Sequence, residues 1–141
     1  MKFKIQVKHS AEMEKFLKGR PTDDQIKESI LRGLEEIGNR ALEMLKQRLP
    51  DSEHKIEFGN EERSLDIRKY RDGLHVEVIG DKVHVKVADG DRFLALLVEY
   101  GSASAELSPM PHWHPTLVQL KLQKAKLVEI LHDQLSKTLF Q

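Results

Sequence analysis

Histidines in the last third of the chain offer the first candidate chemistry. His112 and His114 flank Trp113, and an extended segment would present both imidazoles on one side. A zinc site here would need a third ligand, for which Glu99 and Glu106 are candidates, and hydrogen bonds that orient the rings. No H-E-x-x-H or comparable signature is present. Polar loop residues beside a packed tryptophan explain the pattern more simply. We therefore assign no metal ligand and keep a small metal-binding or hydrolytic module using His112 and His114 as an alternative.

Two further groupings combine residue types used in catalysis. Glu77 and His84 fall opposite each other in an expected hairpin, which favours a cross-strand pair on an exposed face. Ser102, Ser104 and Ser108 lie near the histidines but lack the sharp strand–turn–helix elbow that activates a nucleophilic serine. No phosphate-cradling or dinucleotide-binding glycine motif is present. We therefore predict no enzyme activity, no catalytic residue and no cofactor.

Composition narrows the class of protein. The chain has 141 residues, which suits one domain with one core, and no cysteine, which excludes disulfides and thiolate metal sites. Its 23 basic and 23 acidic residues cancel, without the basic excess usual in nucleic-acid binders. No apolar run approaches the roughly 18 residues of a membrane span, and lysines interrupt the N-terminal apolar residues, unlike a secretory signal. We expect synthesis in the cytosol and no membrane, nucleic-acid or small-molecule partner.

The firmest structural prediction is a β-hairpin over residues 74–87. Apolar and polar residues alternate on both sides of Gly80-Asp81, a two-residue loop whose leading glycine suits a type II′ turn. This loop length places six apolar side chains on one face, as burial of that face requires. The expected apolar pairs are Val78 with Val83, Val76 with Val85 and Leu74 with Val87.

Apolar periodicity predicts the other elements and an α+β fold. Capping-box spacing at Thr22–Gln25 and at Thr116–Gln119 marks two helix starts. We expect a single domain over 1–141, in which an antiparallel sheet packs against a long helix and a C-terminal helix. The expected elements are a strand at 1–8, a short helix at 10–18, a long helix at 22–48, a β-meander at 63–100 that ends in a strand at 93–100, a Pro-rich loop at 101–115 and a helix at 116–139.

The stretch from Glu99 to Pro115 breaks these regular patterns. An apolar run leads into Glu99-Tyr100-Gly101, which suggests a tight turn with a positive φ at Gly101. Three prolines stiffen the return path, and Trp113 is a large anchor surface. These residues fit a turn whose tryptophan caps the core, and they fit equally well an extended loop that docks on neighbouring subunits.

A family resemblance favours the docking loop. The run Leu97-Val98-Glu99-Tyr100-Gly101-Ser102, the pair Met110-Pro111 and the run His114-Pro115-Thr116-Leu117 before a long helix resemble the tail-completion or head–tail joining proteins of long-tailed bacteriophages. The match covers residues 93–120. Ser102 stands where that family usually has Thr, residues 103–109 make the loop longer than the common form, and His112-Trp113 replace a frequent small residue and basic residue.

The resemblance implies a phage or prophage structural protein of the virion neck or upper tail, assembled in the cytoplasm of the bacterial host. Such proteins form rings that complete the tail or join it to the head connector. The implied partners are further copies of this chain and other phage neck or tail proteins. We expect the hairpin 74–87 and the loop 101–115 to supply subunit contacts. A host protein-binding adaptor with a coincidental motif is a further alternative. The predicted assembly positions are Glu99, Tyr100, Gly101, Ser102, Met110, Pro111, Trp113 and Pro115.

Overall fold

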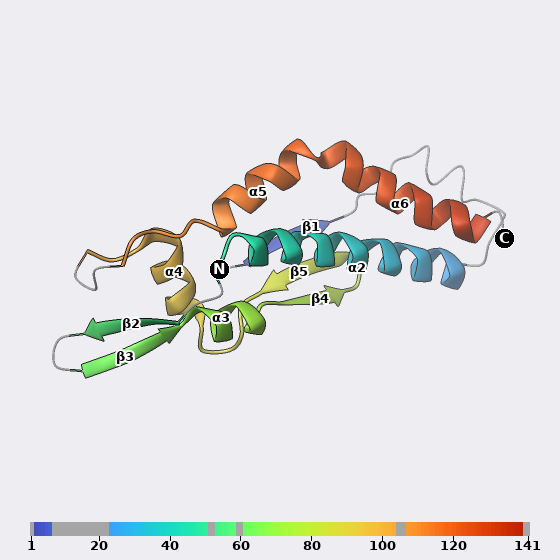
Figure 1. Ribbon diagram of the computed structural model, residues 1–141. Coiled ribbons are helices and arrows are strands. Elements are labelled where there is room, and N and C mark those ends of the chain that lie inside the picture. The colour runs from blue at the N-terminus through green and yellow to red at the C-terminus, as the bar shows by residue number, and fades with distance from the viewer. Residues whose placement is uncertain (1, 7–22, 51–52, 59–60, 104–106, 140–141) are drawn as a thin grey trace.

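The protein stacks two helical layers on one face of a small sheet. A computed structural model describes residues 2–6, 23–50, 53–58, 61–103 and 107–139. The long helix α2 (Asp23–Gln47) packs on a three-stranded antiparallel sheet, and helices α5 (Trp113–Leu122) and α6 (Lys124–Leu139) lie along α2 (Figure 1). The predicted α+β class is confirmed, with the C-terminal helices resting on α2.

The predicted hairpin forms the centre of this sheet. Strands β4 (His75–Ile79) and β5 (Lys82–Lys86) pair antiparallel, and β1 (Lys2–Gln6) adds to β5 to give the order β1-β5-β4. Gly80 has φ 61°, as the first position of a primed hairpin turn requires. The observed register matches the predicted pairs within the strands, namely Val78 with Val83, Val76 with Val85 and Glu77 with His84.

Two glycines let other elements approach α2 closely. A Cβ at Gly33 would lie 2.6 Å from Leu131 Cδ2 of α6, and a Cβ at Gly38 would lie 2.6 Å from both Val76 Cγ1 and Val83 Cγ2. Each glycine destabilises the helix by about 1 kcal/mol relative to alanine. The absence of a Cβ at these positions allows α6 to pack closely on one side of α2 and the sheet on another.

The expected meander over 63–100 is wrong in two places. Strands β2 (Glu53–Phe58) and β3 (Glu61–Asp66) form a second hairpin, which begins before the expected start of the meander at residue 63 and extends away from the main sheet (Figure 1). Asp66 then accepts a hydrogen bond from the backbone N–H of Lys69 at 3.0 Å, which starts the short helix α3 (Ile67–Gly73).

The expected strand at 93–100 is instead the helix α4 (Arg92–Tyr100). Its apolar run is nine residues long, and periodicity alone does not separate a buried strand from a short buried helix. Asp91 precedes the helix, and Gly101 ends it with a hydrogen bond from its N–H to the Leu97 carbonyl at 2.8 Å.

The expected C-terminal helix at 116–139 begins three residues early and is interrupted at Gln123. Thr116 does not cap it but lies buried within α5, where its hydroxyl accepts from Nη1 of Arg48, the residue that follows α2, at 3.4 Å. The expected helix at 10–18 and the cap at Thr22 lie outside the described residues.

In the part of the chain that the structure describes, no helix combines the length and apolar character needed to cross a membrane.

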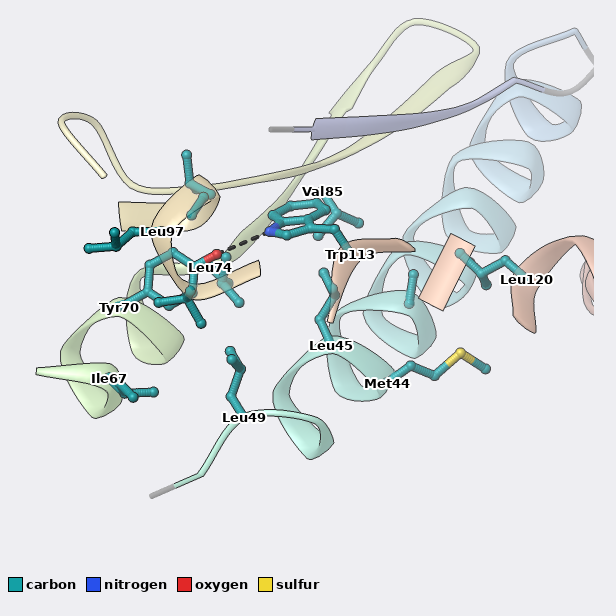
Figure 2. Close-up of a cluster of buried hydrophobic side chains, with 14 of the residues drawn as sticks. Met44, Leu45, Leu49, Ile67, Tyr70, Leu74, Val85, Leu97, Trp113 and Leu120 are labelled. Atoms are coloured by element: carbon teal, nitrogen blue, oxygen red, sulfur yellow. Dashed lines mark hydrogen bonds between the residues drawn. The ribbon is translucent and has the colours of Figure 1, made fainter. Parts of the chain in front are cut away.

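The main hydrophobic core gathers where α2, α3, α4 and α5 meet the sheet. Figure 2 shows side chains from all of these elements converging there, with the Trp113 indole beside Val85 and its nitrogen directed at the Tyr70 hydroxyl. Tyr70 and Trp113 are 1% and 3% exposed. The core residues labelled in Figure 2 are Met44, Leu45, Leu49, Ile67, Tyr70, Leu74, Val85, Leu97, Trp113 and Leu120.

Candidate functional site

The Glu99 carboxylate joins the two helices that border the predicted loop. Glu99 lies on the last turn of α4 and is only 2% exposed. Its Oε2 accepts from the backbone N–H groups of His112 and Trp113, both at 2.8 Å, and its Oε1 accepts from that of His114 at 3.0 Å. These donors are N–H groups at the start of α5, which have no carbonyl partner within the helix, and the helix dipole there also favours negative charge. Glu99 therefore caps α5 from a distant position in the sequence.

Burial and hydrogen bonding act in opposite directions on this carboxyl. Burial raises the pKa of Glu99, but the three backbone N–H donors together hold the pKa below its ordinary value. Glu99 is therefore ionised at neutral pH. This external cap also explains why α5 begins at Trp113 rather than at the predicted Thr116.

The His112 ring continues the network into the core. His112 is 0% exposed. Its Nδ1 lies 2.9 Å from the Met110 carbonyl oxygen and 2.9 Å from Glu99 Oε2, so Nδ1 faces two acceptors and must carry the proton. Its Nε2 lies 2.7 Å from Tyr70 Oη. The neutral ring thus donates at one nitrogen and accepts from the tyrosine hydroxyl at the other.

Tyr70 completes the chain of hydrogen bonds. Its hydroxyl accepts from Trp113 Nε1 at 3.0 Å, as the dashed line in Figure 2 shows, and donates to His112. Burial lowers the pKa of His112 and raises that of Tyr70. Both groups are therefore neutral near pH 7. The arrangement satisfies buried polar groups and fixes α3, α4 and α5 against one another.

The turn after Glu99 also has a defined backbone geometry, which requires glycine at position 101. Gly101 has φ 71°, which confirms the expected positive value. A Cβ there would lie 2.6 Å from the Leu107 carbonyl oxygen and 2.7 Å from the Pro109 nitrogen. Ser102 and Leu107 exchange two backbone hydrogen bonds, each of 2.9 Å, and Met110 N–H donates to the Val98 carbonyl at 2.8 Å. The segment therefore folds back on α4.

The two histidines considered for metal binding do not share a side. His112 lies in the core with both ring nitrogens engaged, whereas His114 is exposed. The segment is not extended here, because the chain enters α5 at Trp113. Among the residues that the structure describes, no group of three or more metal-ligating side chains comes together.

The predicted assembly positions divide between the core and the surface. Glu99 and Trp113 are buried, whereas Ser102, Met110 and Pro115 are half-buried and Pro111 is exposed. The sequence left open whether this segment caps the core or docks on neighbouring subunits. Burial of Glu99 and Trp113 shows that the part of the segment joining α4 to α5 caps the core.

One face of α4 remains apolar and open. Phe93, Leu96 and Tyr100 recur at helical spacing and are 64%, 46% and 65% exposed. We call these three residues the α4 apolar face. A shallow hollow beside it is lined by Tyr100 and by residues of the following turn, including Leu107 and Pro109. Sequence analysis identified Tyr100 alone on this face, because the run was interpreted as a strand.

Sequence analysis also missed the role of His112 and Tyr70. The sequence did hold one signal, because Glu99 ends an apolar run. A carboxylate that is buried with such a run needs hydrogen-bond donors nearby. Comparison of the chain with protein-family models, with curated proteins and with solved structures finds no match. Function is therefore inferred from the motif and from the geometry above.

Proposed function

We propose that this protein is a phage or prophage structural protein of the neck or upper tail, which assembles into a ring that completes the tail or joins it to the head connector. The observation that carries the proposal is the motif over residues 93–120. Two features of the fold support it. The network around Glu99 gives the motif one defined shape, and the α4 apolar face presents three large side chains to solvent beside it.

The α4 apolar face suits an assembly role because exposed apolar patches on soluble domains commonly mark protein contacts. Tyrosine and phenylalanine are also enriched in the centres of such contacts. The partners proposed are further copies of this chain and the head-connector or tail proteins of the same phage. The assembled protein would reside in the virion neck or tail.

The test examines assembly of the full chain, alone and with the connector and tail proteins encoded near its gene. Sedimentation velocity and negative-stain electron microscopy should show rings or partner-bound rings. Phe93→Ser combined with Tyr100→Ser should weaken assembly at least about tenfold while the melting temperature stays near that of the wild type. Leu122→Ser combined with Val118→Ser is the matched control, because both residues are exposed on α5. Only monomers in every mixture would overturn the proposal.

A further inference from the structure

The outward face of the three-stranded sheet is strongly basic. The valines of β4 and β5 point towards α2, so the alternate residues of each strand point the other way. The strand register places Lys2 beside Lys86, Lys4 beside His84, and His75 beside Lys86. We call this set the basic sheet face; its cationic or titratable members are Lys2, Lys4, Lys82, Lys86, His75 and His84.

The positive field of this face is visible in its central histidine. Burial lowers the pKa of His84, and Lys2, Lys86 and Lys4 lower it further. Glu77 is the acidic residue that shares the face within the strands, and it pairs with Lys86. Lys2 and Lys4 are exposed on the edge strand. The face therefore presents uncompensated positive charge to solvent.

A second surface of the same chain carries the opposite charge. The side of α2 that faces neither the sheet nor α6 bears Asp24, Glu28, Glu35 and Glu43, all exposed. We call these four residues the acidic α2 stripe. Lys27, Arg32 and Lys46 lie on the same helix; Arg32 pairs with Glu28, and Lys46 lines the same shallow hollow as Glu43. The basic sheet face and the acidic α2 stripe therefore carry opposite charge on one chain.

We propose that the basic sheet face of one copy docks on the acidic α2 stripe of a second copy. This inference rests on the proposed ring assembly and identifies its interface. The dimensions are compatible: Glu28 and Glu43 are about 22 Å apart along the helix, and a five-residue strand spans about 17 Å. A contact between two different surfaces is heterologous, the type of contact that closes into a ring when repeated. Nucleic acid is disfavoured as the occupant, because the chain itself supplies a complementary surface and has no basic excess.

The test compares two charge-reversed variants of the full chain by sedimentation velocity, under the conditions in which the wild type assembles. Lys2→Glu with Lys4→Glu disables the basic sheet face, and Glu35→Lys with Glu43→Lys disables the acidic α2 stripe. Each variant alone should associate at least about tenfold more weakly than the wild type. An equimolar mixture should regain association, because each variant retains the surface that the other lacks. Wild-type association should also weaken as salt rises from about 50 mM to about 500 mM.

Lys121→Glu with Lys126→Glu makes the same charge change on exposed positions of α5 and α6 and should assemble like the wild type. A mixture of variants that stays monomeric, or a control that fails equally, would overturn the inference. A wild type that does not self-associate but binds a 20-base-pair DNA duplex through Lys2 and Lys4 would overturn it in favour of a polyanion site. Rings unaffected by either pair of substitutions would remove this interface and leave the proposed function intact. Absence of assembly with every partner would remove both.

Discussion

Two glutamate–histidine pairs in this protein have the same chemistry and opposite surroundings. Glu99 and His112 meet in the core, where the side chains are 2% and 0% exposed. Glu77 and His84 face each other across the β4–β5 hairpin, on the outward side of the sheet. In both pairs the pKa of the carboxyl and the pKa of the imidazole are lowered.

The causes of these shifts differ between the pairs. In the core, burial lowers the pKa of His112, while three backbone N–H groups offset the burial of Glu99. On the sheet, Lys86 lowers the pKa of Glu77 by hydrogen bonding and charge, and burial together with neighbouring lysines lowers that of His84. The core pair therefore stabilises the fold, whereas the sheet pair belongs to a charged surface that salt can screen.

The largest effect that separates the pairs is expected for Glu99→Gln. The substitution replaces one acceptor oxygen by an amide that faces backbone N–H donors and removes the charge at the start of α5. We expect the free energy of unfolding to fall by about 3 kcal/mol. Urea unfolding would measure the loss, with Glu77→Gln as the matched control, whose unfolding midpoint should stay at the wild-type value. Equal effects of the two substitutions would contradict the distinction between core pair and surface pair.

A smaller loss is expected from Gly101→Val, which disturbs the turn that follows Glu99. Valine strongly disfavours a positive φ, and its Cβ would collide with the backbone at Leu107 and Pro109. We expect a loss of about 2–3 kcal/mol in the free energy of unfolding. Gly90→Val separates the two causes, because Gly90 has φ 89° but no atom within 4 Å of a Cβ. A thermal melt that shows the same loss at both glycines would mean that the collision at Gly101 contributes nothing.

The sequence was most informative where two local rules agreed. The β4–β5 hairpin was predictable because the two-residue loop and the apolar alternation fix the same register. The positive φ of Gly101 was predictable because the chain changes direction directly after an apolar run. The long helix α2 followed from its periodicity, although the reason for its internal glycines required the packing of Leu131, Val76 and Val83.

The sequence was least informative where distant residues decide the structure. The start of α5 depends on Glu99, thirteen residues before His112 in the sequence, and no local cap announces it. Burial of His112 depends on Tyr70 in α3, which sequence analysis placed in a meander. The basic sheet face also required the pairing of β1 with β5, because zero net charge conceals charges that are separated in space.

The smallest expected effect is the pH dependence of stability contributed by His112. Its folded-state pKa is lowered, so the unfolded chain binds the proton more tightly. This contribution is therefore complete above the ordinary histidine value of 6.5 and is lost as the pH falls below it. We expect the free energy of unfolding to fall as the pH is lowered from about 6.5 to about 5.5. The lowered pKa of Glu99 adds its own loss only below the ordinary value of 4.5, outside this window.

Comparison with His84 isolates the buried histidine. Burial lowers the pKa of His84 and lysine neighbours lower it further, so the part due to the lysines should shrink in about 500 mM salt. Among the residues that the structure describes, no cation contributes to the lowered pKa of His112, so its share of the pH dependence should persist. The contribution of each histidine is measured by urea unfolding at both pH values and at high salt. The proteins compared are the wild type, His84→Gln and His112→Gln. His84→Gln should keep the pH dependence, and His112→Gln should lose most of it in addition to being less stable. The reverse result would place the acid-sensitive group on the sheet and not in the core.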